Sequence, residues 1–278
     1  MKGTDFVFVW IAPPGDAFAR EDLKYAMRSL EASWVGNMRV TVVGDDPKFT
    51  GQIWHAPHER IESDLMPKAL DAVRKMEAII GLPYVQDRFV YMYDDTYFLR
   101  PVDELWLSRR RAVREVPDGW TGGGSRKHQE ALGNTVKCLR DNGFTRIWDY
   151  ETHMPRFFEK RKMLEVIHLY KADVRRLLLP TLYFNHHYKG QEPEILSPHD
   201  DVKVMFKGRL ANGVKPAPTT NEMKALEYYR QHIIGKHVWN HNNKGIRDPG
   251  LQHLRYTLWP NESSFEAAPK RTRLSIAR

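Results

Sequence analysis

The fold is decided by residues 88–102, which read RFVYMYDDTYFLRPV. The run from Phe89 to Tyr93 is continuously apolar rather than alternating, as expected for a strand buried on both faces of a parallel sheet. Two adjacent carboxylates, Asp94 and Asp95, follow this strand directly. Ligands of open α/β sheets bind outside the carboxyl ends of the strands. The stretch therefore predicts a central strand, Arg88 to Tyr93, with a functional site at its end.

Similar short apolar runs come earlier in the chain and also predict buried strands. Helical patterns with one apolar stripe lie between them. Alternation of strand and helix is typical of an α/β fold with a mixed, mainly parallel sheet flanked by helices. The predicted strands are Asp5 to Ile11, Met38 to Val43 and Gln52 to Trp54, and the predicted helices are Glu21 to Ser33 and Pro67 to Ile80.

The second half of the chain differs in character, although we expect one domain over residues 1–278. After an α/β half over 1–107, residues 108–148 contain three consecutive arginines and three glycines and predict a basic insertion or lid. A solvated surface loop explains the same composition. Residues 149–268 are expected to be largely helical up to 190, irregular from 192 to 221 and helical again from Glu222 to Ile234. A basic tail, 269–278, follows.

Composition limits the classes of function. With 278 residues, of which 41% are hydrophobic, the chain can bury a sizeable core. The single cysteine, Cys138, excludes an internal disulfide and a cysteine-based zinc site. No segment reaches membrane length and the amino terminus lacks a secretory pattern, so we expect a cytoplasmic protein without a membrane span. The net charge of +8 favours a polyanionic partner, but solubility accounts for it equally well.

Adjacent carboxylates at a strand end suit a hard divalent cation. Asp94 and Asp95 would hold Mn²⁺ or Mg²⁺, which neutralises a diphosphate and stabilises a leaving group. The alternative is an Asp-Asp turn in which one side chain caps a helix.

The same stretch resembles the second conserved region of the Stealth family. These enzymes transfer hexose-1-phosphate from nucleotide-sugars, and their nucleotide-binding fold is similar to that of GT-A glycosyltransferases. Further segments resemble the other regions in the family's order. They are DFVFVWIAPPGD (5–16), REDLKYAMRSLEASW (20–34), THMPRFF (152–158), HVWNHNNKG (237–245) and LRYTLWPNESSFE (254–266).

This resemblance implies a GT-A-like (Rossmann-like) fold, in which 1–107 binds a nucleotide-sugar and 149–268 binds the acceptor and completes the catalytic site. It implies three groups of site residues. The catalytic group is Asp95, His153, Arg175 and Arg176; the donor-binding group is Asp5, Trp10, Arg20, Tyr25 and Asp94; and the metal-binding group is Asp94, Asp95, Asn240 and Asn242.

Each of these residue types also has a purely structural interpretation. His153 can accept a proton from the acceptor hydroxyl, although a lone histidine is more often structural. Arg175 and Arg176 can clamp a diphosphate or can be surface charges. Adjacent side chains diverge, so we expect His186 and His187 to pack rather than to share a metal ion.

Three functions remain open from the sequence. The first is transfer of a sugar-1-phosphate from a nucleotide-sugar to a hydroxyl of a polysaccharide or another acceptor. The second is simple glycosyl transfer from the same donor, because the first region departs from the family's pattern at Ile11 to Pro14 and the Asn-Asp-Asn turn reads Asn240-His241-Asn242. The third is a nucleic-acid-binding module or an enzyme that glycosylates modified DNA, suggested by the basic cluster from Arg109 to Arg114.

Overall fold

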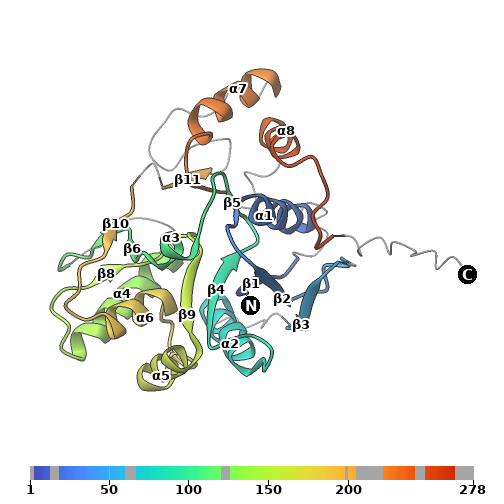
Figure 1. The fold of residues 1–278 in the computed structure, drawn as a ribbon. Coiled ribbons are helices and arrows are strands. Elements are labelled where there is room, and N and C mark those ends of the chain that lie inside the picture. The colour runs from blue at the N-terminus through green and yellow to red at the C-terminus, as the bar shows by residue number, and fades with distance from the viewer. Residues whose placement is uncertain are drawn as a thin grey trace, which may run out of the picture.

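A five-stranded sheet forms the centre of the protein (Figure 1). The structure is a computed structural model that describes residues 3–12, 19–49, 51–59, 67–119, 126–197, 200–204, 222–241 and 248–266. The strand order is β3-β2-β1-β4-β9. The strands are β1 (Thr4–Trp10), β2 (Met38–Gly44), β3 (Ile53–Pro57), β4 (Arg88–Tyr93) and β9 (Arg156–Glu159).

Strands β1 to β4 run parallel, and β9 lies antiparallel to β4 at one edge. The mixed, mainly parallel sheet flanked by helices is therefore confirmed. The position of β9 was not expected, because the sequence predicts mostly helix between 149 and 190. Arg156 lies opposite Tyr91 and Phe158 lies opposite Phe89, so the edge strand continues the aromatic surface of β4.

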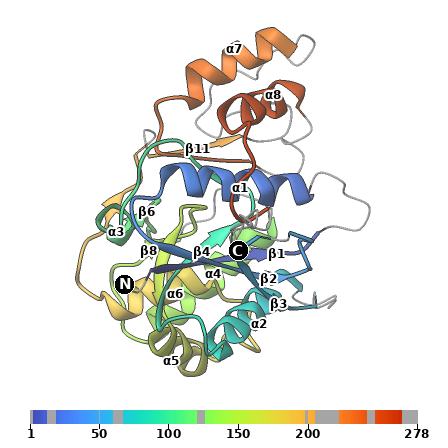
Figure 2. The ribbon, with the colours of Figure 1, turned by 45° about the vertical axis from the view of Figure 1, so that its right-hand side comes forward.

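Helices cover both faces of the sheet, as Figure 2 shows. Alternate residues of a strand point to opposite faces, so Phe6 and Phe8 pack in one hydrophobic cluster and Val7 and Val9 pack in another. The helix α1 (Ala19–Ser33) contributes to the first cluster. The helices α2 (Pro67–Gly81) and α5 (Lys160–Tyr170) contribute to the second.

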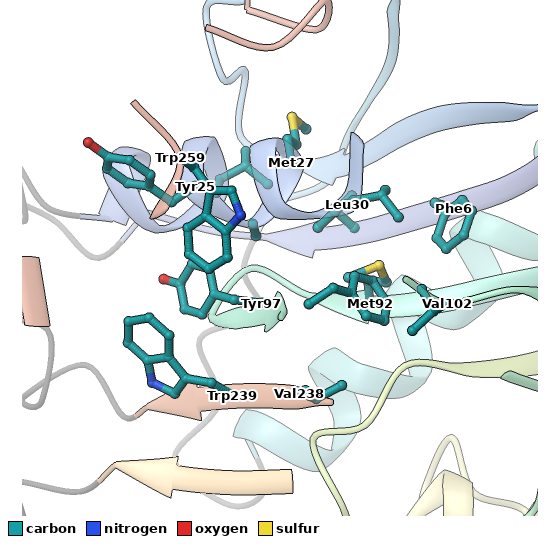
Figure 3. Packing of buried hydrophobic residues seen from close by; sticks show 14 of the residues in the cluster. Phe6, Tyr25, Met27, Leu30, Met92, Tyr97, Val102, Val238, Trp239 and Trp259 are labelled. Atoms are coloured by element: carbon teal, nitrogen blue, oxygen red, sulfur yellow. The ribbon is translucent and has the colours of Figure 1, made fainter. Parts of the chain in front are cut away.

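A smaller sheet continues the first cluster beyond β4. It has the order β11-β12-β5, with β11 (Asp201–Val204), β12 (Val238–His241) and β5 (Thr96–Phe98). Helices α7 (Glu222–Ile233) and α8 (Pro249–Leu258) contact each other beside it. The rings of Trp239 and Trp259 lie 4.7 and 5.7 Å from that of Tyr97 (Figure 3). No helix in the described ranges is long and apolar enough to cross a bilayer.

Much of the segment 108–148 is regular structure, where the sequence predicts an irregular basic insertion. Cys138 and Leu139 on the helix α4 (Arg126–Asp141) are buried in the second cluster, and Leu132 on the same helix is also buried. A lid role stays a prediction, and the glycines at 122–124 and the tail 269–278 lie outside the described residues. The elements here are α3 (Glu104–Ser108), β6 (Arg111–Ala112), β7 (Arg114–Glu115), α4 (Arg126–Asp141) and β8 (Trp148–Asp149), followed after β9 and α5 by α6 (Leu179–His187) and β10 (Glu194–Ile195).

The segment after α8 is tied to α1 by a two-pronged ion pair. Arg28 donates through Nε and Nη2 to the two carboxylate oxygens of Glu266, at 2.7 and 2.8 Å, and through Nη1 to the carbonyl of Trp259. Both charged side chains are largely buried. Burial acts to raise the pKa of Glu266, but the hydrogen bonds from Arg28 and Ser263 outweigh it, and the pKa is lowered.

We predict that Arg28→Met lowers the free energy of unfolding at pH 7 by about 3 kcal/mol, because it leaves the buried Glu266 carboxylate without its partner. The depressed pKa of Glu266 means that this contribution is present at neutral pH and is lost as the pH falls below the ordinary value of 4.5. Denaturant titration at several pH values measures both effects. Arg74→Met is the matched control, since Arg74 forms an exposed ion pair with Glu77. Equal stability of the two variants would contradict the prediction.

Candidate active site

Asp94 and Asp95 form the turn between β4 and β5. Strand β4 delivers them to the carboxyl edge of the parallel strands, and β5 then joins the smaller sheet beside β12. Both carboxylates are half-buried, with Tyr93 before them and the buried Thr96 after them. The site predicted from residues 88–102 therefore lies where the two sheets meet.

A third carboxylate adds its charge to this pair. Burial raises the pKa of Asp94 well above its ordinary value, and the charges of Asp95 and Asp22 raise it further. Asp22 lies in the first turn of α1 and is buried. Lys75 on α2 acts in the opposite direction, but it is also paired with Asp71 at 2.8 Å. The edge therefore concentrates negative charge, which a bound cation would compensate.

His153 lies beside Asp95, although 58 positions separate them in the chain. Its Nδ1 is 3.5 Å from Oδ1 of Asp95, and its ring stacks on that of Tyr93 at 4.9 Å. The hydroxyl of Thr96 donates to the backbone carbonyl of His153 at 3.2 Å. Burial, more than any nearby charge, raises the pKa of Tyr93 to about 12, so this phenol stays protonated beneath the imidazole. The structure thus brings two of the predicted catalytic residues together.

The loop that carries His153 is folded around Arg156. The guanidinium of this buried arginine donates to the carbonyls of Tyr150, Thr152 and Met154 and to the hydroxyl of Thr152. Arg156 itself belongs to β9 and lies opposite Tyr91. Because all of these bonds come from one planar guanidinium, Arg156 fixes the loop on either side of His153 against the sheet.

A buried polar network lies behind the carboxylates. Arg255 on α8 donates through Nη1 to Oδ1 of Asp22 at 2.6 Å and to the hydroxyl of Tyr97 at 3.1 Å. Nε2 of His241 lies 2.9 Å from the same hydroxyl and 3.6 Å from Asp22. These four side chains join α1, β5, β12 and α8. The sequence analysis assigned none of them to the site.

Asn240 reaches the same region from β12, where it pairs with Thr96. Its side chain is fully buried, and Nδ2 donates to Oδ1 of Asp201 at 2.6 Å. No donor from the described residues reaches its Oδ1. A buried amide oxygen without a donor is a rare feature and fits a ligand position. Asn242, the other amide predicted to bind metal, lies outside the described residues.

Three of the predicted donor-binding residues lie at the end of β1 or on α1. Trp10 is the last residue of β1 and is buried. Tyr25 lies on α1, where the guanidinium groups of Arg28 and Arg255 face its ring at 5.1 and 4.9 Å. Arg20, at the beginning of α1, is exposed and donates to the carbonyl of Lys48.

The structure does not bring the other predicted residues to the turn. Asp5 lies at the amino end of β1, opposite the carboxyl edge, and its carboxylate is bound by Arg39 and the backbone of Gln86. Arg175 donates to Cys138 and to the carbonyl of Tyr170, and Arg176 pairs with Glu130 on α4. These contacts fix the connection between α5 and α6 against α4.

A second group of metal-ligand side chains lies on α5 and α6. One ligand atom from each of Glu165, His186 and His187 lies within 4.8 Å of the others. The sequence predicts that the adjacent histidines diverge, but their rings lie 4.7 Å apart in an edge-to-face contact. His186 also contacts Tyr170 and Glu165, and His187 contacts the carbonyl of Lys162. These partners account for the cluster without an ion.

Comparison of the chain with models of known protein families finds no match, and no curated protein sequence matches it. The interpretation of the site therefore depends on its geometry. The site residues that were not predicted from the sequence are Asp22, Tyr97, Arg156, His241 and Arg255. All five lie inside the segments used for the resemblance, and Arg156 directly follows Thr-His-Met-Pro, which is the one signal that pointed to it.

We predict that Asp94→Asn stabilises the protein at neutral pH in the absence of divalent cations. The raised pKa shows that the folded state disfavours the charged carboxylate. We expect a gain of about 1 kcal/mol, or roughly 2–4 °C in the unfolding midpoint. The gain should vanish as the pH falls below 3.8, where the carboxyl becomes protonated in both states. Thermal melts across pH measure this.

The control for this measurement is Asp141→Asn, which removes an exposed carboxylate paired with Lys137. Its unfolding midpoint should differ little from that of the wild type. A lower midpoint for Asp94→Asn than for the control would contradict the interpretation of a crowded acidic site.

Proposed function

We propose that this protein is a metal-dependent transferase that takes its donor from a nucleotide-sugar. The observation that carries the proposal is the pairing of Asp95 with His153, at 3.5 Å, beside the charges of Asp94 and Asp22. This group lies at the carboxyl edge of a mainly parallel sheet, where open α/β proteins bind nucleotides. The ordered resemblance to the Stealth family, which implies a GT-A-like core, and the mainly parallel sheet agree with this interpretation.

The side chains present fit a hard divalent cation. Asp94 and Asp95 supply carboxylate oxygens, and the buried Oδ1 of Asn240 lacks a donor among the described residues. Oxygen ligands of this kind suit Mg²⁺ and Mn²⁺. Such an ion, when bound, neutralises the diphosphate of the donor and so stabilises its leaving group.

His153 is suited to accept the proton of the attacking hydroxyl. With Nδ1 directed at Asp95, the ring presents Nε2 as the basic nitrogen, and the carboxylate stabilises the imidazolium that forms. Stacking on Tyr93 orients the ring, and the bond from Thr96 holds the backbone of His153 in place. The proton moves from the acceptor oxygen to Nε2 as that oxygen bonds to the donor.

Two reactions are consistent with this arrangement. If the oxygen attacks the β-phosphorus, the bond to the bridging oxygen breaks, a sugar-1-phosphate is transferred and a nucleoside monophosphate leaves. If the oxygen attacks the anomeric carbon, the sugar alone is transferred and a nucleoside diphosphate leaves. The resemblance favours the first. Mass spectrometry of a mixture of nucleotide-sugars incubated with the protein distinguishes the two by the nucleotide that is released.

We predict that Asp95→Asn abolishes turnover while the protein stays folded, because the variant loses both a metal ligand and the partner of His153. Chelation should abolish wild-type turnover, and added Mn²⁺ or Mg²⁺ should restore it. Asp87→Asn, which changes a carboxylate before β4 rather than after it, should keep full activity. Undiminished turnover in chelator would refute the metal assignment.

We predict that His153→Ala lowers kcat by about 10²–10⁴-fold, the usual contribution of a general base, with little change in donor affinity. The loss should shrink at high pH, where the acceptor hydroxyl ionises more readily. His168→Ala, which removes an exposed histidine of α5, is the control. A wild-type rate for His153→Ala would leave this residue with a structural role only.

A further inference from the structure

A cleft lined by arginines lies along the outer side of the edge strand β9. Its walls are β9, the loop 150–154 and the segment from Leu107 to Arg111, and its volume is about 560 Å³ including the part open to solvent. Five arginines line it, at positions 88, 109, 110, 111 and 156, against one carboxylate, that of Glu159. The residues lining it do not include Asp94, Asp95 or Asn240, so it is separate from the acidic edge.

Three of the five arginines are compensated by neighbouring groups. Arg88 pairs with Glu104 and donates to Ser108, and Arg109 pairs with Glu194 at 2.9 Å. Arg156 donates to the loop that carries His153. Binding of a nucleic-acid backbone by the basic cluster would require a row of free charges along the surface. Arg109 does not provide one, because its charge is paired with Glu194.

Arg111 is the exception, because its charge is buried and only partly compensated. The residue is 7% exposed, and its guanidinium lies 4.2 Å over the ring of Trp106. Nη1 donates to the carbonyl of Trp106, but Nε and Nη2 have no hydrogen-bond partner in the part of the chain that the structure describes. A carboxylate oxygen of Glu194 is 4.0 Å from Nε, and the charge of Asp200 also acts on the guanidinium. Burial lowers the pKa of Arg111, as expected for a poorly compensated charge.

Arg110 presents one more donor to the same cleft. Its guanidinium lies 4.4 Å over the ring of Tyr188, and its Nη1 is buried without a partner among the described residues. Two arginines with a structural role behave differently, although Nε of Arg255 is also buried without a partner among the described residues. Arg28 uses Nε, Nη1 and Nη2, and Arg156 likewise uses all three nitrogens. Buried donors are nearly always satisfied in folded proteins, so the donors of Arg110 and Arg111 indicate an absent ligand.

We propose that this cleft binds a phosphate group, with Nε and Nη2 of Arg111 and Nη1 of Arg110 as its hydrogen-bond donors. Nε and Nη2 lie on one edge of the guanidinium plane and match two oxygens of an oxyanion. The donor of Arg110 serves a third oxygen. A phosphate monoester presents three terminal oxygens, whereas a carboxylate presents two, so the donor set favours the phosphate.

The position of the cleft points to the acceptor as the molecule that carries this phosphate, an assignment that rests on the proposed function. Thr152 and Met154 line the cleft, and His153 between them faces Asp95. The loop 152–154 thus separates the cleft from the acidic edge. A phosphorylated acceptor anchored by Arg110 and Arg111 would extend past this loop toward His153.

Isothermal titration calorimetry with inorganic phosphate tests the binding site of the wild-type protein directly. The ionic strength is held constant with chloride. We expect saturable binding of phosphate and much weaker binding of acetate. Arg110→Met and Arg111→Met should each weaken phosphate binding by roughly tenfold or more, since each loses a charge-assisted contact. Arg161→Met, which removes an exposed arginine of α5, should bind as the wild type does.

Arg111 is buried, so its replacement by methionine can impair folding. Arg111→Lys keeps the charge but loses the two-pronged edge, and it should fold and still bind phosphate more weakly than the wild type. Absence of phosphate binding by the wild type, or equal binding by Arg110→Met and Arg111→Lys, would overturn the proposal. Equal affinity for acetate would overturn the choice of phosphate.

The assignment to the acceptor is tested separately from the proposed reaction. Asp95→Asn should bind phosphate as the wild type does, because the cleft does not include Asp95. In the active enzyme, Arg110→Met should raise the KM for a hexose phosphate acceptor but not for the parent hexose. An equal effect on both would overturn the acceptor assignment. Phosphate binding by a protein that turns over no nucleotide-sugar would instead refute the proposed function and leave the cleft in place.

Discussion

Asp22, Asp94 and Asp95 concentrate negative charge at a half-buried edge, and the surrounding structure compensates it from several sides. Arg255 binds Asp22 directly, Lys75 acts on Asp94, and His153 lies against Asp95. Each compensating group comes from a different part of the chain, so the smaller sheet, α8 and the loop 150–154 all have to be in place around the turn. Burial of these carboxylates and repulsion between their charges destabilise the folded protein. Functional sites often retain such destabilising groups, and here they would favour binding of a cation.

The main sheet could be predicted because its strands are apolar on both faces. The bounds of β4 agree with the prediction, and those of β1 and β2 differ by one residue at most at either end. Strand β9 could not be predicted in the same way. It has only four residues, and its hydrophobic pattern is too short to be recognised beside the longer helical patterns that follow. The sequence predicts a basic insertion at the arginines 109–111 because it shows their charge. It does not show that Glu194, Tyr188 and Trp106 contact them in the folded chain.

For the candidate site, too, the sequence indicates residues within local motifs but not the contacts between distant segments. Asp95 and His153 could be proposed from the sequence because each lies in a recognisable local segment, but only the structure shows that they lie side by side. Arg175 and Arg176 were predicted from the resemblance, with a register uncertain by several residues, and their partners are Cys138 and Glu130. The Asp22–Arg255 pair joins residues 233 positions apart, and no spacing rule relates such distant residues. A single sequence therefore does not reveal that Asp22 and Arg255 contact each other.

The contacts of α1 with the far end of the chain also determine when this protein can fold during synthesis. Asp22 and Arg28 leave the ribosome more than two hundred residues before Arg255 and Glu266 do. At about 5–20 residues per second, the first helix spends at least ten seconds without the partners that neutralise its buried charges. Contacts of such separation also make folding slow, because the chain entropy is lost before they form. During that interval the apolar side chains of β1 and α1 that pack against later segments are exposed to chaperones.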